Sequence, residues 1–419
     1  MKKYRVNSIL ISLLLVCAMA INFTGCTANE NQAENLMTNV KASNTEVSDD
    51  ISFQNQSYTD FAVRLFKESE ESDKNILISP FSVFCALAMT ANGAKGETLE
   101  QMESVLGMTA EEMNQYIYSY MKNLPQEEKC KLSLANSIWL NDENNFAVNN
   151  DFLQTNADYY GADIYTSPFN EKTCGDINNW VKQNTDEMIP EILDEISADA
   201  VMYLVNALAF DAEWDENYEK ERVKKEIFTK EDGTEQSAEF MHSSEGTYLE
   251  DKNAVGFMKY YSGSKYAFAA MLPNKGTSLF DYVKSLTGES VSAMLAKPQY
   301  ETVFASIPKF ETEYNAQMSE TLKEMGMIKA FDMNGADFSG LGNSDRGKIY
   351  ISRVLHKTFI SVGEMGTKAG AASAVELKCG SAMEDEIKEI YLNRPFVYMI
   401  IDCENNIPLF IGTVTDIVQ

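Results

Sequence analysis

The chain of 419 residues contains only two histidines, and this scarcity limits the catalytic chemistry open to it. A triad of serine, histidine and carboxylate would have to use His242 or His356. No G-x-S-x-G sequence is present, and His356 lies in "VLHKTF", an apolar pattern typical of a strand. A structural role is therefore the favoured interpretation of His356. A hydrolase would be recognised by an activity that disappears when His356 or His242 is replaced.

Metal and phosphate sites find no support in the spacing of the residues. The seven cysteines are dispersed without a C-x-x-C pair, and two isolated histidines do not make a ligand set. The stretch "NGAKGET" (92–98) has neither the spacing of a phosphate-binding loop nor a strand before it. No pair among the 63 acidic residues stands in a diagnostic catalytic context. We therefore expect no cofactor, no metal and no enzymatic activity.

The amino-acid composition also limits the classes of molecule that the chain could bind. The chain has 35 lysines and arginines against 63 acidic residues, a net charge of −28, which repels nucleic acid and anionic lipid headgroups at long range. At 44% hydrophobic residues it can bury a large core. We expect a globular monomer that does not bind nucleic acid and whose cysteines are mostly buried free thiols.

The first 26 residues resemble an export signal. A basic start precedes the apolar stretch "ILISLLLVCAMAI" (9–21), and "FTGC" (23–26) follows it. "FTGC" resembles the lipobox of bacterial lipoproteins, in which the cysteine is acylated, although Phe23 replaces the usual leucine. We expect an exported protein, either a cell-surface lipoprotein attached to the membrane through Cys26 or, with a plain signal peptide, a secreted one.

The rest of the chain is expected to form a tether and one large domain. Residues 27–50 are polar and predict a flexible tether, and no composition shift after residue 51 marks a second boundary, so 51–419 is expected to be a single domain. Helical patterns lie at 58–69 and 176–193. The stretch 79–107 predicts a helix that begins at a serine cap, then a glycine-containing turn and a second helix. The β-branched and aromatic runs that predict strands are 131–140, 200–210, 266–273, 301–310, 396–402 and 408–416. Strands scattered between helices indicate an α+β fold.

Several of these stretches, in this order, resemble the serpin family of serine protease inhibitors. The matching segments are "NILISPFSV" (75–83), "LVNALAFDAEW" (204–214), "GMIKAFDMNGADFSG" (326–340), "VLHKTFISVGEMGTKAGAASA" (354–374), "NRPFVYMI" (393–400) and "PLFIGTV" (408–414). The resemblance implies three β-sheets wrapped by eight or nine helices. It also implies an exposed reactive-centre loop at about 364–392.

The resemblance gives His356 a structural role. In the family, the equivalents of Ser79, Ser82, Asn206 and His356 form a hydrogen-bonded group beneath the central strands of the main sheet. We call these four residues the shutter cluster. A histidine among apolar residues needs such partners, so the residues themselves agree with this role.

At the start of the reactive loop, the charge and size of the side chains alternate between odd and even positions. From Thr367 to Glu376 the odd-numbered residues are uncharged and mostly small, whereas both charges, on Lys368 and Glu376, fall on even positions. This pattern suits a strand with one buried face. The resemblance implies that it is the hinge that inserts into the main sheet, and the hinge residues are Glu364, Gly366, Thr367, Ala369, Gly370, Ala371 and Ala372.

The implied function is inhibition of an extracellular serine protease, or of a cysteine protease, by a suicide-substrate mechanism. The protease cleaves the loop, is trapped as an acyl-enzyme, and is carried along as the hinge inserts. The alternative is a non-inhibitory surface binding protein, or a sacrificial protease substrate, with the same fold.

The position of the scissile bond is left open. Counting from Glu364 by the family's loop length gives Gly380 followed by Ser381, whereas counting back from Asn393 gives Glu384. We favour the first count because the length of the inserting strand determines how far the protease travels. The window around Gly380 is small and uncharged, which suits elastase-like or subtilisin-like proteases. The alternative scissile residues are Lys378, Cys379 and Met383.

Overall fold

The structure is a computed structural model that describes residues 33–43, 52–70, 74–124, 129–142, 146–345, 347–367 and 387–417. Residues from Ala33 onward form one compact unit. The expected export signal with Cys26 lies outside the described residues. So do the later hinge residues and the scissile candidates, namely Ala369, Gly370, Ala371, Ala372, Lys378, Cys379, Gly380, Ser381, Met383 and Glu384.

Nine α-helices lie within the described residues, in agreement with the expected number. They are α2 (Ser52–Glu68), α3 (Pro80–Ala91), α4 (Gly96–Leu106), α5 (Ala110–Lys122), α6 (Asn150–Tyr159), α7 (Glu171–Asn184), α8 (Leu279–Ser285), α9 (Gly288–Leu295) and α10 (Ser319–Glu324). The turn predicted inside 79–107 separates α3 from α4. Helix α7 stops short of the expected residue 193 because Asp186 and Glu187 adopt left-handed backbone angles, with φ of 49° and 62°.

The largest sheet has seven strands in the order β1-β5-β3-β6-β16-β15-β13. Their bounds are β1 (Glu34–Asn35), β5 (Asp163–Ser167), β3 (Cys130–Asn141), β6 (Met202–Glu213), β16 (Gly366–Thr367), β15 (Arg353–Gly363) and β13 (Phe310–Gln317). Strands β6 and β15 pair directly and in parallel from Tyr203 and Arg353 to Ala207 and Lys357. Beyond that stretch, the two residues of β16 lie between them.

Two further multi-stranded sheets complete the expected set of three. The six-stranded sheet is made of β2 (Ile76–Ile78), β19 (Ile407–Val414), β18 (Phe396–Asp402), β11 (Tyr266–Pro273), β10 (Ala254–Tyr260) and β9 (Tyr248–Glu250). The four-stranded sheet is made of β17 (Lys388–Tyr391), β12 (Val303–Pro308), β8 (Glu235–Glu245) and β7 (Val223–Thr229). A short ladder joins β4 (Ala147–Val148) to β14 (Gly342–Asn343).

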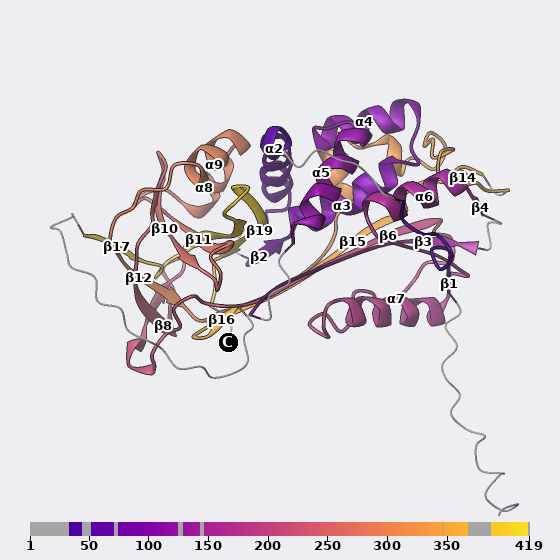
Figure 1. Cartoon of the computed structure of the whole chain (residues 1–419). Helices are drawn as coiled ribbons and strands as arrows, with labels where there is room; N and C mark the ends of the chain where they lie inside the picture. The colour runs from indigo at the N-terminus through magenta and orange to yellow at the C-terminus, as the bar shows by residue number, and fades with distance from the viewer. Residues whose placement is uncertain are drawn as a thin grey trace, which may run out of the picture. The chain divides into compact units, whose positions relative to one another are not determined.

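The seven-stranded sheet is buried on both faces, and this burial explains its apolar strands. All twelve residues of α3 are buried between the sheets, whereas α7 covers the opposite face over a separate apolar cluster (Figure 1). Along β6, Leu204 belongs to the large core and its neighbour Val205 to the α7 cluster. Successive residues of each central strand therefore point into different apolar clusters on the two faces of the sheet. Because both faces are buried, the sequence of the strand is continuously apolar.

The described part of the expected tether is packed against the domain. Residues Glu34 and Asn35 add β1 to the edge of β5, and Leu36, Met37 and Val40 pack on the large core. The packed part of the chain therefore begins upstream of residue 51, where the sequence predicted its start. The sequence feature that could have predicted this packing is the group of three apolar residues, Leu36, Met37 and Val40, within a polar stretch.

The cysteines of the described region follow the expectation of free thiols. Cys85, Cys130 and Cys174 are buried and Cys403 is partly buried, all without a disulfide. Burial raises the pKa of the Cys85 thiol, so this thiol stays protonated. No helix within the described ranges is long and apolar enough to cross a membrane.

Two glycines test the packing of the helices. A Cβ atom on Gly288, the first residue of α9, would lie 2.5 Å from the Cα atom of Asp60 on α2, whereas a Cβ atom on Gly175 within α7 would meet nothing within 4 Å. We expect Gly288→Ala to lower the free energy of unfolding by about 1–3 kcal/mol through overpacking. Gly175→Ala should raise it by about 0.5–1 kcal/mol because alanine is the better helix former. Urea unfolding of both variants checks this, and equal effects would contradict the helix contact.

Candidate functional site

The structure brings together the four residues of the shutter cluster where β6 and β15 pair directly. Asn206 and His356 are register partners on the two strands, and His356 Nδ1 lies 2.7 Å from Asn206 Oδ1. The Ser82 hydroxyl donates to the same oxygen at 2.8 Å. Asn206 Nδ2 donates to the Leu355 carbonyl at 3.0 Å. All four side chains are fully buried.

Ser79 connects this cluster to helix α3. Its side chain caps the helix by accepting from the Ser82 N–H, and its own N–H donates to His356 Nε2 at 3.1 Å. Because Nε2 accepts a hydrogen bond, the proton of the neutral imidazole sits on Nδ1 and is donated to Asn206. The cluster therefore joins α3, β6 and β15 through one histidine tautomer.

Burial keeps this histidine neutral. Desolvation lowers the pKa of His356 from 6.5 to about 3. A second ring proton would also break the bond from Ser79, since Nε2 could no longer accept. The imidazole is thus a neutral structural group at physiological pH.

The start of the expected hinge lies farther along the same two strands. Gly366 pairs with Glu213 on one side and Gly363 on the other, and Thr367 pairs with Ala212 and Val362. Gly366 has a φ of +150°, and a Cβ atom there would lie 2.8 Å from the Glu213 Cα atom. Glycine is therefore required at the point where the chain enters the sheet.

Thr367 faces the interior, on the parity predicted to be buried. Its side chain is 1% exposed, and its hydroxyl lies 2.6 Å from the Tyr261 hydroxyl. Tyr261 in turn stacks on Trp214, with ring centroids 4.4 Å apart. Trp214 Nε1 donates to the Gly363 carbonyl at 2.8 Å. The stacked rings of Tyr261 and Trp214 thus contact the segment from Gly363 to Thr367.

Glu364 is held by an ion pair that the sequence did not predict. Lys309 Nζ lies 2.5 Å from Glu364 Oε1 and 2.9 Å from Glu239 Oε2. Partial burial acts to raise the pKa of Glu364, but the hydrogen bonds from Lys309 and the backbone outweigh it and hold this pKa below its usual value. The carboxylate is therefore charged, and it holds the segment before β16 against Lys309, the residue between β12 and β13.

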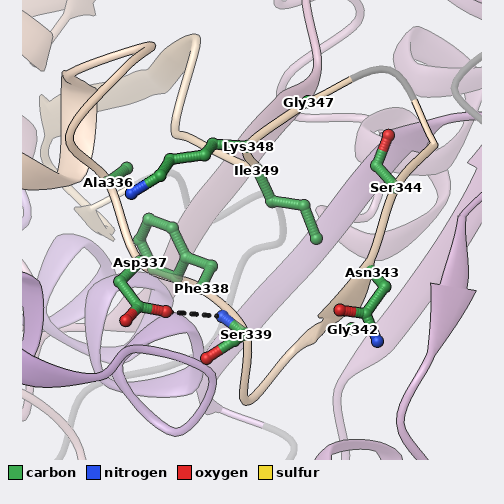
Figure 2. Close-up of a pocket in the computed structure, with 10 residues that line it drawn as sticks. All are labelled: Ala336, Asp337, Phe338, Ser339, Gly342, Asn343, Ser344, Gly347, Lys348 and Ile349. Atoms are coloured by element: carbon green, nitrogen blue, oxygen red, sulfur yellow. Dashed lines mark hydrogen bonds between the residues drawn. The ribbon is translucent and has the colours of Figure 1, made fainter.

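One surface pocket of the described region lies between the segments that follow α10 and precede β15. Figure 2 shows this pocket, lined by residues 336–339, 342–344 and 347–349, in which Asp337 Oδ1 accepts from the Ser339 N–H at 3.1 Å. Its lining contains neither histidine nor cysteine. Within the described ranges no three metal-ligating side chains gather.

His242 lies apart from the shutter cluster, on the four-stranded sheet. Its Nε2 atom is 2.8 Å from Glu226 Oε1, and its ring centroid is 6.4 Å from that of Tyr391. Within the described part of the chain, no hydrogen bond links either histidine to a serine hydroxyl.

The buried histidine predicts a pH dependence of stability. Because the pKa is lowered in the folded state, protons bind the unfolded chain preferentially below about pH 6.5, and stability falls as the pH drops toward 3. His356→Gln should be less stable at pH 7, but its deficit should shrink by about 2 kcal/mol between pH 7 and pH 5. Urea unfolding at both pH values checks this. A deficit that does not change with pH would show that His356 does not titrate as described.

Comparisons with known proteins agree with this geometry. The family model described as Serpin (serine protease inhibitor) matches residues 56–417. A serpin-like protein of Thermococcus kodakarensis is 29% identical over 84% of this chain and 83% of its own length. Serpin B6 of Pongo abelii is 30% identical over 84% of this chain and 96% of its own length.

Solved structures match over almost the whole chain. The thermophilic serpin tengpin in its native state is 49% identical, with a TM-score of 0.88 over 92% of this chain and 100% of its own. Tengpin in its latent state gives a TM-score of 0.78 at 47% identity, over 90% and 100% of the two chains. With the three sheets, the nine described helices and the family match, the chain belongs to the serpin family of serine protease inhibitors.

Proposed function

We propose that this chain inhibits serine proteases as a suicide substrate whose hinge inserts between β6 and β15. The observation that carries the proposal is that Gly366 and Thr367 already occupy the first two positions between these strands. The protease serine attacks the carbonyl of the scissile residue and forms an ester with it, and the new amino terminus leaves. Insertion then distorts the active site before water hydrolyses the ester.

Continuing the register of β16 predicts how far insertion proceeds. Thr367 pairs with Ala212, so antiparallel pairing of the next ten residues would reach Met202, the first residue of β6, at Leu377. At a net 0.5–1.5 kcal/mol for each new hydrogen bond, insertion releases on the order of 10 kcal/mol. Only five register pairs join β6 and β15 directly, so at the same value per hydrogen bond breaking them costs less than insertion releases.

The same register favours Gly380 over Glu384 as the scissile residue. Gly380 would lie three residues beyond the level of Met202, whereas Glu384 would lie seven beyond it. A shorter free segment holds the protease more tightly against the end of the sheet. The small, uncharged window 379–383 supports an elastase-like or subtilisin-like target.

We further propose that inhibition takes place outside the cytoplasm. The support is the basic and apolar amino terminus ending in "FTGC" (23–26), with Cys26 as the site of acylation if the lipobox is used. Mass spectrometry of the mature amino terminus would identify the cleavage site and any acyl chain.

The deciding experiment is incubation with elastase-like and subtilisin-like proteases. Inhibition predicts a covalent complex that survives SDS electrophoresis, and mass spectrometry of this complex identifies the scissile residue. Cleavage of the loop without any complex would instead identify a sacrificial substrate or a non-inhibitory binding protein.

Two neighbouring hinge residues provide a matched test of insertion. Thr367→Arg places charge and bulk on the buried face, so we expect cleavage to continue while the SDS-stable complex decreases at least tenfold. Alternation along the strand predicts that Lys368 faces the opposite side, and Lys368→Glu should leave the complex largely intact. The yield of complex per cleaved inhibitor measures both effects, and equal losses would contradict the assigned parity.

A further inference from the structure

The four-stranded sheet exposes three large apolar side chains around the start of β17. Ile387 is 53% exposed, Phe304 on β12 is 41% exposed and Tyr391 on β17 is 36% exposed. We call these three residues the β17 patch. Single exposed apolar side chains are ordinary, but a group of them indicates an interaction surface.

Strand register places the patch on one face. Strands β12 and β17 are parallel neighbours in which Phe304 is opposite Glu389 and Ala305 is opposite Ile390. Ala305 and Ile390 are both buried, at 1% and 2% exposure, so the residues on either side of them point outward. Ile387 and Tyr391 stand two residues before and after Glu389. The three apolar side chains therefore surround one carboxylate on the outer face.

One member of the patch, Tyr391, covers a buried hydroxyl together with His242. Ser306 is opposite Tyr391 on one side and His242 on the other, and the two rings approach to 6.4 Å across it. The Ser306 Oγ atom is buried without a hydrogen-bond partner. His242 is also fixed by its 2.8 Å contact with Glu226. The outer face is thus a packed surface and not a set of free side chains.

The position of the patch in the chain indicates its occupant. Ile387 lies in the carboxyl-terminal part of the expected loop, six residues after Ser381, so at about 3.4 Å per residue the favoured scissile bond lies within about 20 Å of it. A protease of ordinary size is about 40 Å across, by the same scaling that gives compact domains their radius. A protease bound at that bond is therefore wide enough to reach the β17 patch.

From this reach and register we propose that Phe304, Ile387 and Tyr391 are a contact surface for the target protease, separate from the residues around the bond it cleaves. The inference rests on the proposed function, because it requires a protease that cleaves the loop. A second copy of the chain is a poorer occupant, since two molecules of net charge −28 repel each other. Contact at the patch would speed the encounter without changing the later insertion.

The test compares association rate constants for a protease that cleaves the full chain. The double substitution Phe304→Ser with Ile387→Ser removes the apolar contact and leaves Tyr391 over Ser306. We expect the rate constant to fall about five- to tenfold. The fraction of cleaved inhibitor that becomes complex should be unchanged. Phe304→Leu with Ile387→Leu should recover most of the rate. The matched control is Ile328→Ser, 57% exposed beside helix α4, which should have no effect.

Each outcome decides the proposal. An unchanged rate for the serine variant, an equal loss with leucine, or an equal loss with Ile328→Ser would overturn it. Dimers of the wild-type chain that the serine substitutions dissociate would identify a second copy as the occupant instead. If the protease cleaves the loop without forming a complex, the rate of cleavage replaces the rate of inhibition, so a failure of inhibition is distinguishable from a failure of the patch.

Discussion

Strands β6 and β15 share direct hydrogen bonds over only part of their length, and the other features of the site depend on this limited contact. They pair in parallel from Tyr203 to Ala207, and the two-residue strand β16 separates them near Ala212. A sheet closed along its whole length would have no place for a further strand, and a fully open one would leave backbone groups unpaired in the core. The intermediate arrangement leaves room for the proposed insertion, and contacts that hold the strands in place would oppose it.

The contacts that would oppose insertion are polar and lie at the two ends of the stretch over which β6 and β15 do not pair directly. At the closed end the shutter cluster joins both strands to α3 through Asn206 and His356. At the open end the ion pair of Lys309 with Glu364 and the bond between Thr367 and Tyr261 hold the entering segment. Buried polar groups are costly to separate because each lost partner leaves a desolvated donor or acceptor. Directional bonds therefore keep the strands in register without filling the space between them.

Patterns local in sequence predicted most of the fold. The Ser79 cap and the turn before α4 mark helices directly, and parity assigned Thr367 to the buried face. Contacts between distant segments were harder to predict. Lys309 lies between β12 and β13, and Tyr261 directly follows β10, so both are far from the hinge in sequence. No periodic feature distinguishes them from their neighbours. The four shutter residues came from the family resemblance, since a sequence shows that His356 needs partners but not which residues the topology brings to it.

The amino-terminal segment joins the seven-stranded sheet at the end opposite the hinge. Glu34 pairs with Thr166, which is aligned through Leu140 with Met202. Strand β1 therefore enters the sheet at the end where β6 begins, opposite the end where Gly366 enters. If the hinge inserts as proposed, it would extend along β6 toward Met202, so the inserted strand would end on the side of the sheet that carries β1.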